Sequence, residues 1–175
     1  MQQLITAQEF ATYRNISKKL DVGKINECIL EAQQSDLLTT LDDFYFDVLK
    51  NANEASYTDL MEGSIFEVGG YEYQQAGIKA LLADYVYSRY IYNLNVQQTP
   101  FGARIKTSDN SEAVDRNTLK DMAKQSQQDA GYKFKYIDKY LTTDPVLFER
   151  YYKNNNRCEE QNNNRNFKSI KTSVL

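Results

Sequence analysis

Residues 80–94, with the sequence ALLADYVYSRYIYNL, are apolar on every side of any helix that they could form. A helix with one exposed side alternates apolar and polar stripes. An all-round apolar helix is therefore either central to a bundle or shared with a neighbouring molecule. The residues expected to hold the bundle are Leu81, Leu82, Tyr85 and Val86.

Apolar residues recur every three or four positions in several other segments, which predicts further helices. Thr6 and Glu9 have the spacing of a capping box, and Asp21 is a suitable N-cap. Asp144 followed by Pro145 is typical of a helix start. The expected helices cover residues 6–13, 22–34, 40–49, from 74 or 75 to 93–95, from 111 or 115 to 141, and 145–154.

The helix that ends at residue 141 has one apolar stripe, so we expect it to be buried on one side. Its start is capped by Ser111 or by Asp115. The expected stripe consists of Leu119, Met122, Ser126, Ala130, Phe134 (or Lys133), Ile137 and Leu141.

A different pattern occupies residues 65–73, IFEVGGYEY, where two glycines lie between β-branched and aromatic residues. Glycine supplies the positive φ of a tight turn, so this segment predicts a small β-hairpin. Residues 99–102, TPFG, are expected to end the all-round apolar helix, and residues 103–112 are expected to form an extended arm.

The C-terminal end differs from the rest of the chain in composition and charge. Residues 1–149 contain 15 Lys and Arg against 22 Asp and Glu, whereas residues 150–175 contain 6 against 2. Residues 154–166 are asparagine-rich and too polar to bury a core. We therefore expect a mainly α bundle of about five helices with one small β-hairpin in residues 1–153, and a linker with an extended basic tail in residues 154–175.

Few catalytic arrangements are compatible with this composition. The chain has no histidine, which removes the commonest general base and a common zinc ligand. Its glycines lack the spacing of a nucleotide-binding loop, and SDNSEAVDRN has valine where a calcium loop needs glycine. We predict no catalytic residue, no metal site and no cofactor, and therefore no enzymatic activity.

The cysteines and the hydropathy indicate the redox compartment of the protein and its relation to membranes. Cys28 and Cys158 are far apart in a chain without a signal-type start, which favours free thiols in a reducing compartment. Asp84 and Arg89 interrupt the longest apolar stretch, so no transmembrane segment is expected. These features predict a soluble protein without a membrane partner.

Tyrosine is the most unusual part of the composition, with 14 residues against 8 phenylalanines and no tryptophan. Tyrosine is enriched at subunit interfaces, where its ring packs and its hydroxyl meets water or a partner. Our candidates for a subunit interface are Tyr87, Tyr90, Ile91, Phe101 and Arg104.

The order of these features resembles the head-tail connector proteins of tailed bacteriophages, particularly those of crAss-like phages. The resemblance covers residues 4–141 and depends on short structural motifs around the hairpin, the tyrosine-rich helix and the TPFG turn. The positions that carry it are Tyr57, Leu60, Gly63, Gly77, Ile78, Lys79, Tyr85, Tyr87, Tyr90, Thr99, Pro100, Gly102, Thr107 and Ser108.

The resemblance implies a structural virion protein at the neck of the particle, assembled in the cytoplasm of the bacterial host. Proteins of this family form a ring, typically of twelve copies, that docks below the portal, extends the DNA channel and joins the capsid to the tail. DNA would pass through without specific binding, and the next tail or adaptor ring would be a further partner. The expected portal-docking residues are Phe167, Ile170, Lys171 and Val174.

An alternative function is nucleic-acid binding by the basic C-terminal tail on a helical body. Clustered cations bind phosphate backbones with an affinity that falls steeply as salt is added. The cations in question are Arg150, Lys153, Arg157, Arg165, Lys168 and Lys171.

Overall fold

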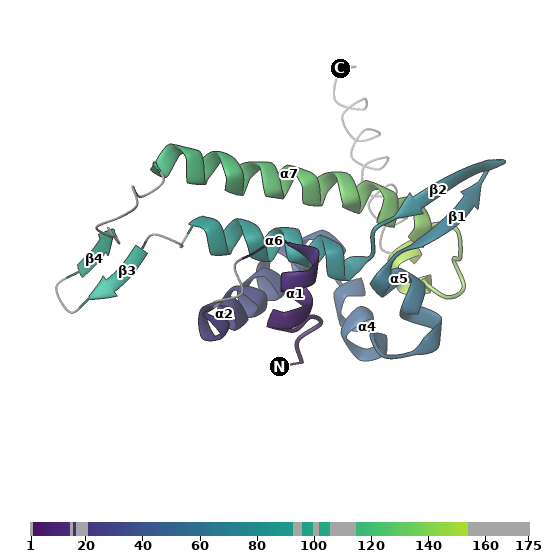
Figure 1. The fold of residues 1–175 in the computed structure, drawn as a ribbon. Helices are drawn as coiled ribbons and strands as arrows, with labels where there is room; N and C mark the ends of the chain where they lie inside the picture. The colour runs from purple at the N-terminus through teal and green to yellow at the C-terminus, as the bar shows by residue number, and fades with distance from the viewer. Residues whose placement is uncertain are drawn as a thin grey trace, which may run out of the picture.

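A computed structural model describes residues 2–14, 16, 21–92, 96–99, 102–105 and 115–153, with backbone alone for residues 96–99 and 102–105. Within these ranges the protein is mainly α, with seven α-helices and two β-hairpins. The two longest helices, α6 (Ile78–Tyr92) and α7 (Arg116–Leu141), lie side by side (Figure 1). On the opposite side of α6 pack α1 (Ala7–Tyr13) and α2 (Val22–Ala32).

The caps expected for the first two helices are confirmed. The Glu9 amide donates to the Thr6 hydroxyl at 3.1 Å, and the Thr6 amide donates back to the Glu9 carboxylate at 2.8 Å. The Asp21 carboxylate accepts from the Lys24 amide at 3.2 Å. Local side-chain chemistry therefore sets both helix starts.

The second helix is regular α-helix only to Ala32, close to the predicted end near residue 34, but the chain does not leave the helical path there. The helical path continues through a π-helical turn (Gln33–Leu37) and α3 (Leu38–Leu41), and it ends only at Asp42, whose φ is 50°. Gln33 is fully buried and accepts a 3.0 Å hydrogen bond from the Leu4 amide, so a tertiary contact stabilises this polar turn. The expected third helix is consequently divided, and its second part is α4 (Phe44–Asn51).

The segment before the hairpin contains a helix that the sequence pattern does not predict. A 3₁₀ turn (Ala55–Tyr57) leads into α5 (Thr58–Glu62). This helix is only five residues long, too short for its apolar positions to show a helical period.

The predicted hairpin is confirmed as β1 (Ser64–Val68) paired antiparallel with β2 (Tyr71–Gln75). Gly69 and Gly70 have φ of 62° and 80°, the positive values that a two-residue hairpin turn of type I′ requires. The predicted start of the next helix at residue 74 or 75 is wrong, because both positions pair in β2. Gly77, with φ of 87°, separates β2 from α6.

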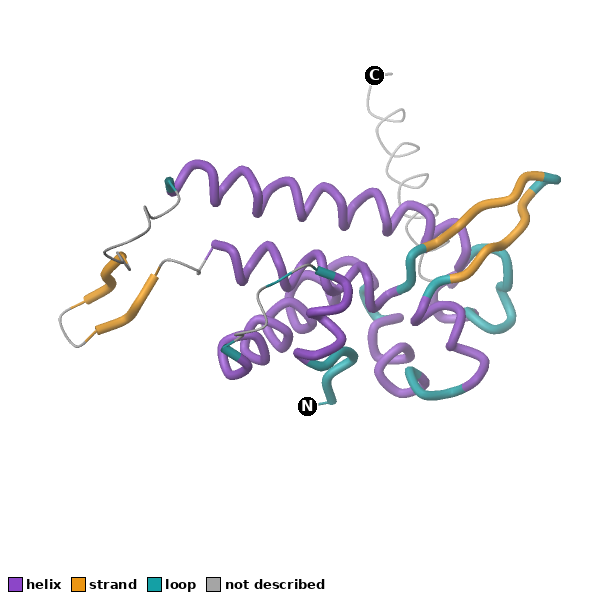
Figure 2. Tube along the Cα trace, in the orientation of Figure 1, coloured by secondary structure: helices purple, strands orange, loops and turns teal. Residues whose placement is uncertain are grey.

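A second hairpin follows α6, where we expected a break and an extended arm. β3 (Val96–Thr99) pairs antiparallel with β4 (Gly102–Ile105), and Thr99 is opposite Gly102. Asp115, one of the two predicted caps, accepts from the Asn117 amide at 3.0 Å and begins α7. Figure 2 shows the two hairpins at opposite ends of the α6 and α7 pair.

The last predicted helix is partly present. The Asp144 carboxylate accepts from the amides of Val146 and Leu147 at 3.1 and 2.9 Å, as an N-cap does. Residues 145–148 form turns, and residues 149–153 are helical. Phe148 and Tyr151 in this segment are buried against Phe44 of α4, with ring centroids 6.0 and 5.3 Å away.

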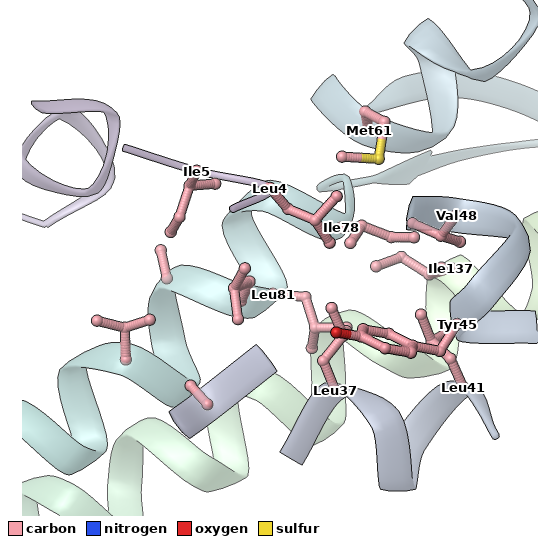
Figure 3. Packing of buried hydrophobic residues seen from close by; sticks show 14 of the residues in the cluster. Leu4, Ile5, Leu37, Leu41, Tyr45, Val48, Met61, Ile78, Leu81 and Ile137 are labelled. Carbon is pink, nitrogen blue, oxygen red and sulfur yellow. The ribbon is translucent and has the colours of Figure 1, made fainter. Parts of the chain in front are cut away.

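One contiguous hydrophobic core joins the helices (Figure 3). On α7 the predicted stripe is confirmed except near its start. Met122 is 40% exposed, and its neighbour Ala123 is buried in its place. Small side chains at Ala123, Ser126 and Ala130 on this buried face allow α7 to pack closely against α6.

The chain itself covers α6. Residues 78–91 are all buried or half-buried, and Tyr92 at the end of the helix is the exposed exception. α7, α2, α5 and α1 all pack against α6. The all-round apolar pattern is thus explained by a central position in the bundle, and α6 needs no second copy to cover it.

Candidate functional site

The most deeply buried charge among the described residues is Asp84, near the middle of α6. Its side chain is 1% exposed and receives a 2.5 Å hydrogen bond from Arg14. Lys133 of α7 lies 2.8 Å from the other carboxylate oxygen, in an ion pair that lacks hydrogen-bond alignment. The Ser126 hydroxyl donates to the Asp84 carbonyl at 2.8 Å. These contacts tie the end of α1 to α6 and α7, and we interpret them as structural.

Two shallow depressions flank the line along which α6 and α7 meet. The first has a volume of about 390 Å³ and lies between α2, α6 and α7. Its lining residues are Glu31, Ser88, Arg89, Tyr92, Lys120, Ala123, Lys124 and Gln127.

Cations dominate this first depression. Arg89 is compensated, because its Nε and Nη2 bind Asp36 at 2.7 and 3.0 Å. Lys120 and Lys124 are exposed, and neither has an ion pair within the described ranges. A hydrogen bond with Arg116 and the charge of Lys120 lower the pKa of the Tyr92 phenol. We call this surface, defined by Lys120 and Lys124, the basic side of α7.

The second depression, of about 380 Å³, is bounded by the end of α1 and by α6 and α7. Its lining residues are Arg14, Tyr87, Asp121, Met122, Gln125, Ser126 and Asp129.

Carboxylates dominate this second depression. Arg14 is compensated by Asp84, and its guanidinium carbon lies 4.7 Å from the centroid of the Tyr87 ring. Asp121 and Asp129 have no ion pair in the described part of the chain; Asp129 accepts only a neutral 3.0 Å hydrogen bond, from Gln125. We call this surface, defined by Asp121 and Asp129, the acidic side of α7.

The β1–β2 hairpin has one packed face and one free face. On the packed face Phe66 stacks on Tyr73 at 5.8 Å and meets Tyr140 of α7 at 5.3 Å. On the free face, Glu67 is directly opposite Glu72. Two large apolar side chains of the hairpin are also exposed, Ile65 by 64% and Tyr71 by 71%.

The described residues contain little that could serve metal or thiol chemistry. No group of three or more His, Cys, Asp or Glu side chains among them is placed to hold a metal ion. Cys28 is a free, buried thiol, and burial raises its pKa. No helix in these ranges combines the length and the apolar character needed to cross a lipid bilayer.

The predicted interface residues do not form one surface. Tyr87 lines the second depression, whereas Tyr90 is half-buried with its ring 6.5 Å from that of Phe10. Ile91 is 5% exposed, so its own chain already covers it. The side chain of Arg104 and the whole of Phe101 lie outside the described residues.

The predicted portal-docking residues also lie outside the described part of the chain. They are Phe167, Ile170, Lys171 and Val174. The four residues that define the basic and acidic sides of α7 were not predicted from the sequence. Their signal was the helical period itself, because Lys120 and Lys124 are one turn apart and Asp121 and Asp129 are two turns apart.

Comparison with curated proteins finds no match, and comparison with solved structures finds none either. Residues 35–161, from within the π-helical turn through all later elements, match the family described as "Family of unknown function (DUF6712)". The chain therefore belongs to the DUF6712 family.

Proposed function

We propose that this DUF6712 protein is a structural, ring-forming head-tail connector of a tailed bacteriophage. In this role it docks below the portal, extends the DNA channel and joins the capsid to the tail in the neck of the virion. The proposal rests first on the resemblance of residues 4–141 to such connectors.

One structural observation supports the proposal further: the protein has several separate surfaces that differ in charge and in apolar character. A closed ring of identical subunits has heterologous interfaces, so each subunit must present two unlike surfaces to its neighbours. The basic and acidic sides of α7 are two such surfaces. The β1–β2 hairpin, with Ile65 near its base and Tyr71 beside its turn exposed, is a third that remains for another ring or the portal.

The body of the protein suits a DNA channel. Residues 1–149 carry an excess of acidic side chains, which favours passage of DNA over tight binding. The basic tail is then the element for the portal, through Phe167, Ile170, Lys171 and Val174 as anchors. An extended peptide of this kind adds a strand to a partner's sheet.

Mixing the full-length protein with portal particles of the same phage tests this function. We expect mass photometry to show particles enlarged by a ring, and removal of residues 154–175 to abolish the gain. The truncated chain should keep its fold, because the hydrophobic core lies between Leu4 and Tyr151. Circular dichroism of the truncated chain is the control for folding.

Two variants separate the contributions of the tail. Ile170→Ser with Val174→Ser removes apolar anchors, whereas Lys168→Gln with Lys171→Gln removes only charge. Strand addition predicts that the first pair costs more binding than the second. A full-length protein that ignores portal particles and is missing from purified virions would refute the connector function.

Nucleic-acid binding by the tail is the second candidate. Two of its six cations are described, and both are paired: Arg150 with Asp47 at 2.9 Å and Lys153 with Glu149 at 2.5 Å. The other four lie outside the described residues. Retention on duplex DNA that falls steeply with added salt, and that is lost without residues 154–175, would favour this function.

A further inference from the structure

Charge is segregated across α7 in its N-terminal half. The buried stripe of this half, formed by Leu119, Ala123, Ser126 and Ala130, faces the bundle. Lys120 and Lys124 lie on one flank of that stripe, and Asp121 and Asp129 lie on the other, since each pair lines a different depression. One helix therefore presents opposite charges on its two flanks.

Each flank also contains a cation that is already neutralised within the chain. Arg89 on the basic side binds Asp36 and lies 3.5 Å from Glu31, and Arg14 on the acidic side binds Asp84. The basic side keeps two lysines together with the exposed carboxylate of Glu31, because Arg89 can neutralise only one of its two carboxylate neighbours. The acidic side keeps two aspartates, so the two flanks still differ in the sign of their net charge. Within the described ranges neither these two lysines nor these two aspartates make an ion pair.

The two flanks are complementary to each other rather than to themselves. A two-fold dimer through either side would place like charges together, which is unfavourable. Head-to-tail contact places the lysines of one copy against the aspartates of the next. Each side has a large apolar residue beside its charges, Tyr92 at 48% exposure and Met122 at 40%, which such a contact would cover.

We propose that the basic side of α7 docks on the acidic side of α7 of a second copy, and that this contact repeats head to tail. The inference rests on the proposed function, for which it names the interface between subunits. Lys120 and Lys124 meet Asp121 and Asp129 of the next copy, and the compensated residues Arg89 and Arg14 stay within their own chain.

Reversing the charges of each side tests the contact in the full-length protein. The basic-side variant is Lys120→Glu with Lys124→Glu, and the acidic-side variant is Asp121→Lys with Asp129→Lys. Analytical ultracentrifugation at low salt should show that each variant associates more weakly than wild type by more than about tenfold. Wild-type association should itself weaken as salt screens the charges.

Restoring complementarity makes the test specific. An equal mixture of the two variants should assemble in alternation, and one chain carrying all four substitutions should assemble with itself. A control that changes net charge elsewhere, Lys50→Glu with Lys135→Glu, should associate like wild type, because both lysines are exposed and line neither depression.

Three results would overturn the inference. They are unchanged association of both reversed variants, failure of the mixture to assemble, and a wild type that stays monomeric at every salt concentration. If the basic-side variant associates with itself like wild type but is no longer retained on duplex DNA, Lys120 and Lys124 contact phosphates instead of a second copy. Portal docking is measured separately, so a protein that enlarges portal particles by a ring through a different interface leaves the proposed function intact.

Discussion

Arg14 and Asp84 are 70 positions apart in the chain, yet the guanidinium of one donates a 2.5 Å hydrogen bond to the carboxylate of the other. The carboxylate is 1% exposed, and Lys133 is its second cationic neighbour. Removing one partner of a buried ion pair leaves an uncompensated charge. We therefore expect Asp84→Ala, which leaves the partly exposed cations Arg14 and Lys133 without their shared partner, to lower the free energy of unfolding by about 1–3 kcal/mol.

The matched control is Arg150→Ala. Its pair with Asp47 is 2.9 Å long but exposed, so its loss should cost only about 0–1 kcal/mol. Urea denaturation followed by circular dichroism measures both changes. Equal losses of unfolding free energy in the two variants would show that the buried ion pair of Asp84 stabilises the fold no more than the exposed pair does.

Gly77 and Gly131 are expected to respond to alanine in opposite directions. At Gly77 the φ is +87° and a Cβ would lie 2.5 Å from the Met61 carbonyl oxygen, so Gly77→Ala should cost about 1–3 kcal/mol or more. Gly131 lies inside α7, and an added Cβ would meet no atom within 4 Å apart from its chain neighbours and the adjacent backbone of its own helix. Gly131→Ala should gain about 0.5–1 kcal/mol by reducing the entropy of the unfolded chain. Thermal denaturation distinguishes the two, and a stabilising Gly77→Ala would contradict the close approach described here.

The directly opposed Glu67 and Glu72 weaken the β1–β2 hairpin. Like charges in a cross-strand pair are destabilising, so Glu72→Lys should raise stability by about 0.2–1 kcal/mol. Adding Glu67→Lys to that variant restores a like-charge pair and should remove the gain. Melting temperatures of the single and double variants provide the measurement, and equal temperatures would mean that the pair does not interact.

Glu9 should make stability depend on pH in the acidic range. Burial opposes its ionisation, but hydrogen bonds from Lys79, at 2.9 Å, and from Thr6 outweigh burial and lower its pKa below 4.5. A carboxyl whose pKa is lower in the folded state stabilises the fold above its unfolded pKa. That stability is lost as pH falls through the folded pKa. Wild type should therefore lose stability below about pH 5 more steeply than Glu9→Gln.

The control for this prediction is Glu54→Gln, an exposed carboxyl without a side-chain hydrogen bond among the described residues. Its urea midpoints should follow those of wild type from neutral to acidic pH. If Glu9→Gln and wild type give parallel curves, the contact with Lys79 contributes nothing to acid sensitivity.

Features set by neighbouring residues were predictable from the sequence. The Thr6 capping box, the Asp21 and Asp115 caps and the glycine turn between β1 and β2 all depend on contacts within a few positions. Features set by distant contacts were not. The π-helical turn is held by Gln33 reaching the N-terminal segment, and nothing in the local pattern shows that contact.

The candidate site was predictable only in part. The all-round apolar pattern of residues 80–94 fitted either a shared surface or a central helix, and the sequence alone does not tell how many helices surround it. α7, α2, α5 and α1 settle this by packing around α6. The charges of α7 were visible in the sequence, but their assignment to two flanks required knowing which side of the helix is buried.

The central place of α6 also constrains how the protein is made. A ribosome releases α6 when α1, α2 and α5 are already outside the exit tunnel, but α7 is not yet complete. Until residue 141 follows, the flank of α6 that α7 will cover is bare and open to chaperones or to other nascent chains. A message truncated before α7 would therefore encode an aggregation-prone fragment rather than a smaller working protein.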